Sequence, residues 1–407
     1  MSLDLDVIPK VFRENQQFAS QVVSLIHKYA DDLKSKFGDE TIKIMNFCGT
    51  HEWTITHYGL RALMPPNVEL IAGPGCPVCV TPSSLIEEAI KLARDGLVVY
   101  TYGDGFRLPT TQVRSGTVRS LKEAKALGAD VRIVYSFLDA IKDAKEHGKP
   151  SVFLGIGFET TAPSYSLLIK EGKVPENLTF MSALRLTPPA QKFTIKLHTE
   201  RGLLPIRGVI APGHVSTVVG AKSWAFLARD FNLPTVVSGF EPIDVLLSVL
   251  EILKMLKEGQ AKVVNEYKRL VSWEGNVYAQ EANKAVFEEE MSVWRGIGYI
   301  PKSGLRLREQ FKRMDAFEQY GVKPPSAQDA VLTNATVRLN SDVPPGCRCG
   351  EVTVGIAKPT DCPMFMTTCT PEKPWGPCMA SSEGTCRVWA TSGLMKKAIS
   401  TIKEGGA

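Results

Sequence analysis

The sequence predicts an α/β protein with two parallel-sheet domains and a smaller cysteine-rich part. Between residues 42 and 240, short apolar runs alternate with helical patterns, which is typical of βαβ units. The runs are more numerous than one small domain needs, and cysteines crowd into the C-terminal tail. In order, the runs are IKIMNF, VELIAG, LVVYTY, VRIVYS, SVFLGI, LTFMSA, IRGVIAPG and PTVVSGF.

Changes of pattern along the chain suggest three domains. We expect a first α/β domain over residues 1–135, and a second over residues 136–325, part of which can pack back on the first. The second carries a helical extension, predicted over residues 242–258 and 262–271. From about residue 324 the chain is rich in Pro, Gly, Thr and Cys, so residues 326–407 are expected to form a small module stapled by metal.

Composition limits the classes of function. The net charge of +5 is spread along 407 residues, so nucleic acid is a poor candidate partner. Charged residues interrupt the longest apolar stretch, Ile243–Leu256, which is too short to span a bilayer. The N-terminus lacks a signal-peptide pattern, and we therefore expect a cytoplasmic protein without a membrane partner. Thiols stay reduced in the cytosol, so the nine cysteines favour metal or redox chemistry over structural disulfides.

Six cysteines fall within forty residues of the tail and indicate a metal centre. They are Cys347, Cys349, Cys362, Cys369, Cys378 and Cys386. Four thiolates can hold either a structural zinc or an iron–sulfur cluster. Zinc modules usually carry closely spaced ligand pairs, whereas the gaps here are one, twelve, six, eight and seven residues. This spacing favours a 4Fe-4S cluster but does not decide the matter alone.

Two further motifs place cysteines after predicted strands. Cys76 and Cys79 form a CxxC directly before a helix expected near Ser83, a setting that can lower thiol pKa values. The alternative is half of a zinc site or two inert buried cysteines. Cys48 ends the first strand, with His51 in reach as a proton carrier or second ligand, which suits iron binding or nucleophilic attack. A buried cysteine beside a satisfied histidine is the competing interpretation.

The remaining polar residues at strand ends have simpler explanations when taken alone. Glu159, Thr160 and Thr161 follow a strand and are typical of helix capping, and the same holds for His214 and Glu241. Gly155-Ile156-Gly157 lacks the rest of a dinucleotide fingerprint, and the sequence has no Walker-type lysine loop. Nucleotide binding therefore has no support.

Taken together and in this order, the motifs resemble those of the HypD family of hydrogenase maturation proteins. They are CGTHE, GPGCPVC, GFETT, APGH and GFEP, followed by CGEV, DCP, CTP and SSEGTC, and they extend from about residue 40 to residue 390. The resemblance implies two Rossmann-like α/β domains facing one another across a cleft, with a C-terminal 4Fe-4S domain. It also implies a role in assembling part of the NiFe hydrogenase active site.

The resemblance further implies partners and a cargo. HypD proteins pair with the chaperone HypC, and together they carry an iron bearing two cyanides and one carbon monoxide, Fe(CN)2CO. HypE delivers the cyanides after HypF has supplied a carbamoyl group. The finished unit passes, via HypC, to the precursor of the hydrogenase large subunit.

Carried over by motif, the resemblance assigns roles to individual residues. Cys48 would hold the iron jointly with HypC, with His51 beside it, and Cys76 and Cys79 would be a redox-active pair. Glu159, Thr160 and Thr161 match the cleft motif. The cluster ligands would be Cys349, Cys362, Cys369 and Cys386. Cys347 and Cys378 are then extra, and either could replace a neighbouring ligand or form a local disulfide.

Electron counting agrees with this role. Cyanide from a thiocyanate-type donor must arrive as an anion, so breaking the S–CN bond requires two electrons. A cluster supplies electrons singly, and a cysteine pair stores two. An iron–sulfur-dependent protein disulfide reductase remains the second hypothesis, although it leaves CGTHE and GFETT without a role. A zinc-stapled hydrolase using Cys48 and His51 is weaker, because no acidic orienting residue can be assigned.

Overall fold

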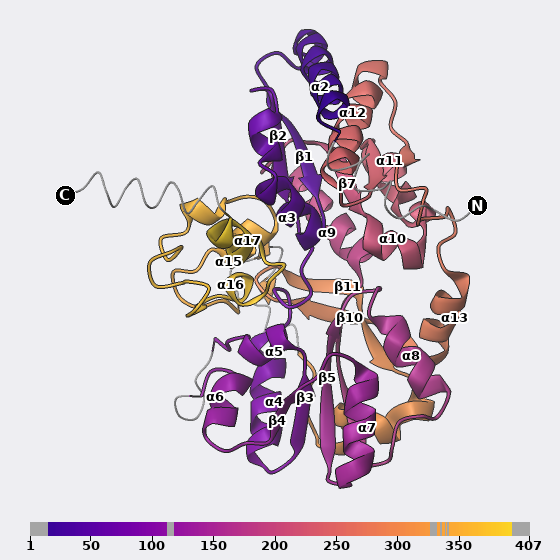
Figure 1. The fold of residues 1–407 in the computed structure, drawn as a ribbon, viewed down its shortest axis with the longest axis vertical. Helices are drawn as coiled ribbons and strands as arrows, with labels where there is room; N and C mark the ends of the chain where they lie inside the picture. Colours follow the sequence, from indigo (N-terminus) through magenta and orange to yellow (C-terminus); the bar gives the residue numbers. More distant parts are fainter. Residues whose placement is uncertain are drawn as a thin grey trace, which may run out of the picture. The chain divides into compact units, whose positions relative to one another are not determined.

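The computed structural model describes residues 15–111, 118–325, 332–333, 336–337, 339 and 342–392 (Figure 1). The chain divides into two compact units, each made of separate stretches of sequence. The first unit comprises Met1–Gly75, Gln191–Asn276 and Val388–Ala407. The second comprises Cys76–Ala190 and Val277–Arg387.

The first unit is built on a five-stranded parallel sheet of order β2-β1-β7-β8-β9. The strands are β1 (Ile42–Asn46), β2 (Val68–Ala72), β7 (Ile206–Pro212), β8 (Thr235–Ser238) and β9 (Val263–Asn265). The helices are α2 (Gln16–Phe37), α3 (Gly49–His57), α9 (Thr187–Arg201, whose first residues belong to the second unit), α10 (Gly213–Val219), α11 (Ala225–Phe231) and α12 (Pro242–Glu258). The first unit also contains the short 3-10 helices η1 (Leu60–Leu63) and η2 (Ala221–Trp224).

Packing of α2 and α12 forms a large part of the first unit's core. Both helices bury apolar residues spaced three or four apart, among them Ile26, Leu33 and Val249. A reciprocal capping box between Glu241 and Asp244 starts α12, and Gly259 ends it with a left-handed φ of 69°. The predicted helix over residues 242–258 is therefore confirmed, including both ends.

The second unit is built on a four-stranded parallel sheet of order β4-β3-β5-β6. The strands are β3 (Val98–Thr101), β4 (Val131–Ile133), β5 (Ser151–Gly157) and β6 (Leu178–Leu184). Helices α4 (Ser83–Arg94), α5 (Gly103–Arg107), α6 (Leu121–Ala126), α7 (Phe137–His147) and α8 (Ala162–Lys170) accompany it. One part of its core is aromatic, with Phe137, Phe153, Tyr165 and Phe180 packed against one another.

The C-terminal stretch of the second unit adds a hairpin and short elements. The hairpin pairs β10 (Phe287–Trp294) with β11 (Gly298–Leu307), and α13 (Val277–Val286) precedes it. Next come η3 (Glu309–Met314), α14 (Ala316–Gln319), β12 (Leu332–Thr333) and β13 (Thr336–Val337). The cysteine-rich segment contains α15 (Cys349–Thr353), η4 (Pro359–Asp361), α16 (Pro377–Ala380) and α17 (Thr385–Thr391, whose residues from Val388 on belong to the first unit).

The predicted fold class is confirmed, since each of the eight apolar runs encloses one of the strands β1 to β8 or coincides with it to within one residue at its end, and the two large sheets are parallel. The helix expected over residues 262–271 is wrong. Val263 and Val264 instead lie in β9, which pairs with β8 as an edge strand. The β-branched pair has a ready partner strand there, and tertiary pairing overrides the weak helical pattern.

The expected domain boundary at residue 135 does not match the strand pairing. β1 pairs with β7 far along the chain, and β3 pairs with β5 across the proposed boundary. The chain therefore leaves the first sheet after β2, completes the second sheet, and returns through β7. Residues 342–387 of the cysteine-rich segment group with the second unit.

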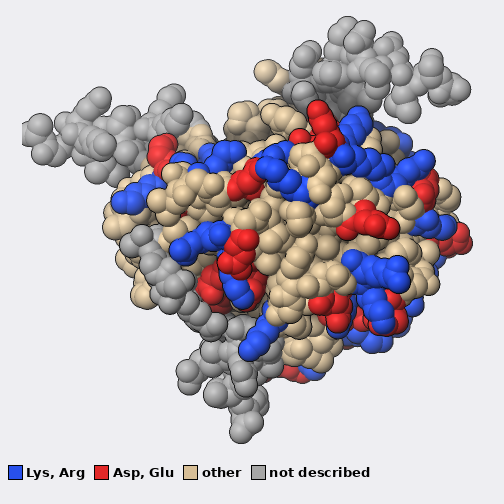
Figure 2. Space-filling model, turned by 90° about the horizontal axis from the view of Figure 1, so that it is seen from below, with Lys and Arg blue, Asp and Glu red and all other residues tan. Residues whose placement is uncertain are grey.

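Charged side chains of both signs are mixed on the face that Figure 2 shows, where lysine and arginine alternate with aspartate and glutamate. Within the described ranges, no helix combines the length and apolar character needed to cross a membrane.

Gly155→Ala should destabilise the second unit. Gly155 lies in β5, and an added Cβ would collide with the buried ring of Phe180. Overpacking of this kind costs about 1–3 kcal/mol, which denaturant unfolding would measure. Gly103→Ala is the matched control, because a Cβ there meets open space. Equal midpoints for the two variants would contradict this account of the packing.

Candidate functional site

Cys48 lies where β1 passes into α3, in the first unit. It is the N-cap residue of α3, with extended backbone (φ −149°, ψ 131°), and its side chain is half-buried. The Gly49 N–H donates to the Gly75 carbonyl at 3.1 Å. A Cβ on Gly75 would collide with the Cys48 backbone, so only glycine allows this approach. The loop therefore holds the Cys48 backbone in place while its thiol keeps some access to solvent.

Glu52 organises the Cys48 loop, a role that the sequence analysis did not assign. Its carboxylate is 1% exposed and accepts two 2.8 Å hydrogen bonds from Arg61. Trp389 Nε1 donates to it at 2.7 Å, and Asn46 Nδ2 at 3.2 Å. The amide oxygen of Asn46 lies 3.5 Å from the Cys48 nitrogen. A buried carboxylate is stable only when paired in this way, so Glu52 fixes the turn that presents Cys48.

His51 is fully buried and electrically neutral near pH 7. Burial lowers its pKa to about 4, and its Nε2 donates to the Gly239 carbonyl at 2.8 Å. Nδ1 has no hydrogen-bond partner among the described residues. The ring stacks on Phe240 at 4.5 Å between centroids, and Phe240 stacks on His214 at 3.8 Å. His51 is therefore anchored by one nitrogen and keeps a lone pair on the other.

The GFETT residues lie in the second unit, where Glu159 makes a capping contact. Glu159 is buried and accepts the Thr187 N–H at 2.7 Å, so it serves the first residue of α9 and not the helix that follows it in sequence. Burial raises the pKa of Glu159 to about 7. Thr161 is the N-cap of α8, without a side-chain cap bond, and Thr160 is exposed. The sequence analysis favoured a capping role for Glu159 at the helix that follows it, α8. In the structure Glu159 caps α9 instead.

The other two capping candidates belong to the first unit. His214 is exposed in the first turn of α10, next to the ring of Phe240. Glu241 caps α12, as the sequence analysis favoured. The structure thus divides the predicted site residues, with Cys48 and His51 in the first unit and the cysteine pair, the GFETT residues and the tail cysteines in the second.

Cys76 and Cys79 form a disulfide at the start of the second unit, with Cα atoms 5.3 Å apart. Both are buried, and the Cys79 N–H lies 3.1 Å from Cys76 Sγ. Thr81 Oγ1 donates to the Pro77 carbonyl at 2.9 Å and tightens the turn before α4. The two cysteines are therefore joined across a tight, buried turn at the start of α4.

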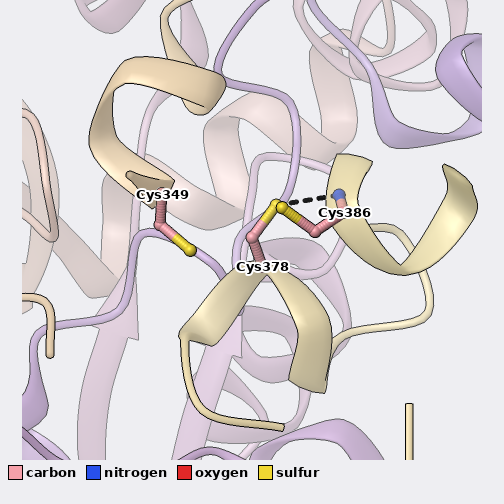
Figure 3. A group of neighbouring side chains, drawn as sticks. All are labelled: Cys349, Cys378 and Cys386. Atoms are coloured by element: carbon pink, nitrogen blue, oxygen red, sulfur yellow. Dashed lines mark hydrogen bonds between the residues drawn. The ribbon is translucent and has the colours of Figure 1, made fainter. Parts of the chain in front are cut away.

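Three tail cysteines form a compact group of buried sulfurs (Figure 3). The sulfurs of Cys349, Cys378 and Cys386 all lie within 4.8 Å of one another, and the Cys386 N–H donates to Cys378 Sγ at 3.3 Å. Cys347 is hydrogen-bonded to both Cys349 and Cys362 through their thiols. Cys378, expected to be an extra thiol, is therefore a central member of the group.

The thiols and their surroundings fit a metal cofactor. Cys369 Sγ accepts the Trp375 N–H at 3.3 Å and interacts electrostatically with Cys349 and Cys362, so all six tail cysteines belong to one neighbourhood. A Cβ on Gly376 would stand 2.7 Å from the sulfurs of both Cys347 and Cys349. Glycine thus leaves the sulfurs uncovered, and buried soft donors at this density suit zinc or an iron–sulfur cluster.

Comparison with known proteins identifies the family. A profile of the HypD family, described as the hydrogenase formation hypA family, matches residues 18–393. Hydrogenase maturation factor HypD of Cupriavidus necator is 42% identical over 360 residues, which cover 86% of this chain and 90% of the relative. The protein of the same name from Escherichia coli K12 is 38% identical over 386 residues, 93% of this chain and 97% of the relative. HypD of Azotobacter vinelandii is 38% identical over 366 residues, 88% of this chain and 92% of the relative.

Both the family match and the curated relatives span nearly the whole chain and carry a consistent name. The chain belongs to the HypD family of hydrogenase maturation factors.

Proposed function

We propose that the protein is a cytoplasmic scaffold on which, together with HypC, the Fe(CN)2CO unit of a NiFe hydrogenase is assembled. The iron is the cargo and not a resident cofactor. It receives cyanide from HypE and passes via HypC to the precursor of the hydrogenase large subunit. The relatives' shared name supports hydrogenase maturation in general, and the thiol chemistry supports the specific steps.

The observation that supports a scaffold most strongly is a contrast in cysteine exposure. All nine cysteines lie within the described ranges, and Cys48 alone is not buried. An assembly site must admit its iron and a partner's ligand, whereas thiols that hold a resident cluster or form an internal pair need no such access, and solvent exclusion around a cluster tunes its potential. Cys48, held by a rigid loop at the start of the helix that carries the neutral imidazole of His51, fits the first requirement. The remaining cysteines fit the second.

The buried thiols are proposed to handle electrons. Cys349, Cys362, Cys369 and Cys386 would hold a 4Fe-4S cluster, which supplies electrons one at a time when bound. Cys76 and Cys79 store two electrons as a dithiol and release them with two protons on forming the disulfide. Two electrons and one proton convert a thiocyanate-type donor into a thiol and a cyanide anion. The cysteine pair therefore matches the demand of cyanide transfer.

The Cys76–Cys79 disulfide also favours a second candidate, an iron–sulfur-dependent protein disulfide reductase. That function would use the pair and the tail cysteines but would leave Cys48 and its supporting network idle. Infrared spectroscopy of the protein purified with HypC separates the two candidates. Metal-bound cyanide and carbonyl bands favour the scaffold, and turnover of a protein disulfide without these bands favours the reductase.

Cys48→Ala should abolish the iron cargo while leaving the resident cofactor intact. The half-buried side chain contributes only about 1–2 kcal/mol of packing. Association with HypC should persist, since an interface of ordinary size rests on many contacts. Infrared bands of cyanide and carbonyl on the copurified complex should disappear. Bands of wild-type intensity would show that the iron is held elsewhere.

Variants of the tail cysteines should sort ligands from neighbours. Cys349→Ala and Cys386→Ala should each lose the brown colour and the bound sulfide, because both positions belong to the proposed ligand set. Cys378→Ala should keep most of the iron despite its place in the buried group of three sulfurs. Iron and sulfide analysis of anaerobically prepared protein decides this. A colourless Cys378→Ala with a brown Cys362→Ala would exchange the two residues in the ligand set.

His51→Gln should remove part of the acid sensitivity of folding. The folded-state pKa of His51 is about 4 and the unfolded value 6.5, so the unfolded state binds the extra proton between these limits. Stability is therefore lost as pH falls from about 6.5 to 4, by about 3 kcal/mol for this group at most. Denaturant unfolding at pH 7 and pH 4 measures the difference. His27→Gln, an exposed histidine on α2, is the control. An unchanged pH slope in His51→Gln would disprove the shift.

A further inference from the structure

Asp104 connects the sheet of the second unit with the cysteine-rich segment. It lies in the first turn of α5, directly beyond the carboxyl end of β3. Its Oδ2 accepts from the Ser382 N–H at 2.8 Å, from Ser382 Oγ at 2.8 Å and from Ser381 Oγ at 3.2 Å. Its Oδ1 accepts from Arg107 at 2.8 Å. Although burial opposes ionisation, the bonds from Ser382 and Arg107 hold the pKa of Asp104 below its usual value, so it is a carboxylate at neutral pH.

The turn that Asp104 holds lies between two cysteines of the buried sulfur group. It runs from Ser381 to Gly384, between Cys378 and Cys386, and a Cβ on Gly384 would collide with the Cys378 carbonyl. The backbone geometry of this turn thus fixes how Cys386 donates to the Cys378 sulfur. A small displacement of the turn would therefore change the geometry around Cys378 and Cys386 without removing either sulfur.

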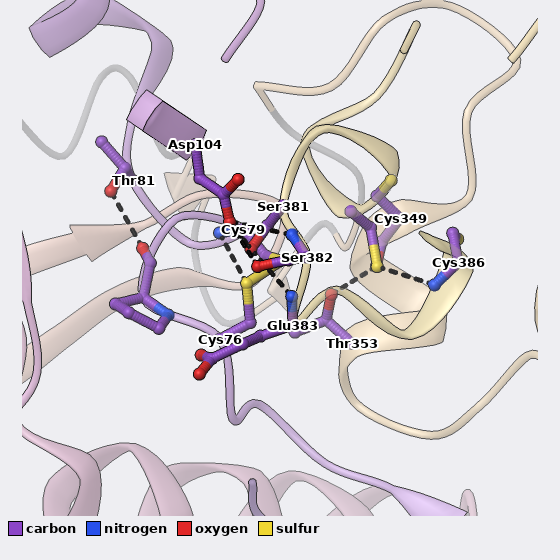
Figure 4. The surroundings of a disulfide bond; sticks show 12 residues. Cys76, Cys79, Thr81, Asp104, Cys349, Thr353, Ser381, Ser382, Glu383 and Cys386 are labelled. Atoms are coloured by element: carbon purple, nitrogen blue, oxygen red, sulfur yellow. Dashed lines mark hydrogen bonds between the residues drawn. A yellow bond between two sulfur atoms is a disulfide. The ribbon is translucent and has the colours of Figure 1, made fainter. Parts of the chain in front are cut away.

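The same turn borders the disulfide. The surroundings of Cys76–Cys79 include Asp104, the turn residues Ser381, Ser382 and Glu383, and Cys349 and Cys386 of the sulfur group (Figure 4). Asp104 therefore acts at the place where the cysteine pair and the sulfur group come together, and all of these residues belong to the second unit.

A second carboxylate holds the other end of the segment. Asp342 accepts from the Ser83 N–H at 2.8 Å and from Thr111 Oγ1 at 2.8 Å, while its carbonyl accepts from the buried Arg295 at 2.8 Å. Ser83 is the first residue of α4, the helix that follows the cysteine pair. With the segment anchored at Asp342, the bonds of Asp104 determine the position of its far end.

We propose that Asp104 is a positioning residue, which clasps the Ser381–Ser382 turn against the Cys76–Cys79 disulfide and so sets the path for electron exchange between this pair and the cluster. The inference rests on the redox role proposed above for the tail cysteines. Reduction of the pair breaks the S–S bond and yields two thiols, with two protons from water. In the test, the two electrons come from dithionite through the cluster.

The experiment compares full-length wild type and Asp104→Ala, both prepared anaerobically with the cluster and mildly oxidised. Timed alkylation after dithionite addition gives the rate of disulfide reduction. The rate should fall about 10- to 100-fold in Asp104→Ala, the loss that a misplacement of about 1 Å can cause. Cluster content and visible absorption should stay at wild-type values. Asp104→Asn keeps one acceptor oxygen for Ser382 and should be intermediate.

A second readout does not depend on the cluster. In dithiothreitol buffers the equilibrium of the pair should move toward the dithiol in Asp104→Ala, by about tenfold or about 30 mV at most, because a neighbouring negative charge that disfavours thiolates is lost. A slower rate despite a more favourable equilibrium is expected of a positioning residue, and general loosening of the fold would not produce it. Asp95→Asn, at an exposed carboxylate beyond α4, is the control and should match wild type in both readouts.

Reduction of the pair at the wild-type rate in Asp104→Ala would overturn the inference. If Asp104→Ala loses its cluster, Ser382→Ala replaces it as the test, since it removes one hydroxyl donor and keeps the carboxylate; a wild-type rate there counts equally against the inference. Failure of the underlying redox role looks different. In that case wild type would reduce its disulfide no faster than the cluster-free Cys386→Ala, whatever residue stands at position 104.

Discussion

The parallel pairing of β1 with β7 is the contact on which the arrangement of the first unit depends. It brings residues 206–265 back to residues 42–72 after the chain has built the whole sheet of the second unit. Without it, His51 would not meet the Gly239 carbonyl, and the stack of His51, Phe240 and His214 would not form. Parallel strands also place their carboxyl ends at one edge of a sheet, so the polar residues that follow β1, β7 and β8 converge there. The chemistry around Cys48 is thus a consequence of sheet closure between distant segments.

The strands themselves could be predicted from local sequence, but their partners could not. Eight apolar runs bounded by Gly, Pro and polar residues correspond to eight strands, and α12 has clear start and stop signals in Glu241, Asp244 and Gly259. Nothing in IKIMNF or IRGVIAPG states that these two runs lie side by side, because any parallel β-branched strand of similar length would satisfy the same hydrogen bonds. The expected boundary at residue 135 failed for this reason. The prediction at β9 failed for a different reason. The three half-buried residues of this edge strand give a pattern too short to distinguish from a helix.

The candidate site shows a similar limit. Cysteine crowding, the CxxC and the CGTHE motif drew attention to residues that the structure places in a buried sulfur group, in a disulfide and at a strand-to-helix turn, since thiols are rare enough to stand out in a sequence. Glu52, Arg61 and Asp104 did not stand out, because carboxylates and guanidinium groups are common and their importance comes from partners far away, such as Trp389 for Glu52 and Ser382 for Asp104. Only their burial in the folded structure indicates that these charged groups position other residues. Spacing along the chain likewise does not report that the short helices α16 and α17 bring Cys378 against Cys386.

Under the proposed function the thiols of this chain have opposite requirements, and their burial differs accordingly. A thiol that receives a metal needs an open approach and a fixed backbone. At Cys48 the backbone lies against Gly75 and next to the amide oxygen of Asn46, which is itself held by Glu52, so the sulfur need not be packed. Thiols that hold or pass electrons need neighbours of their own kind and little water. The tail achieves this with glycine at 376 beside two sulfurs and with carboxylates at 104 and 342 that hold the segment at both ends. The charged groups that anchor the segment lie outside the sulfur group, which leaves its interior to soft donors alone. Such a division would let the anchoring contacts be strong and directional without competing with the thiols for a bound metal.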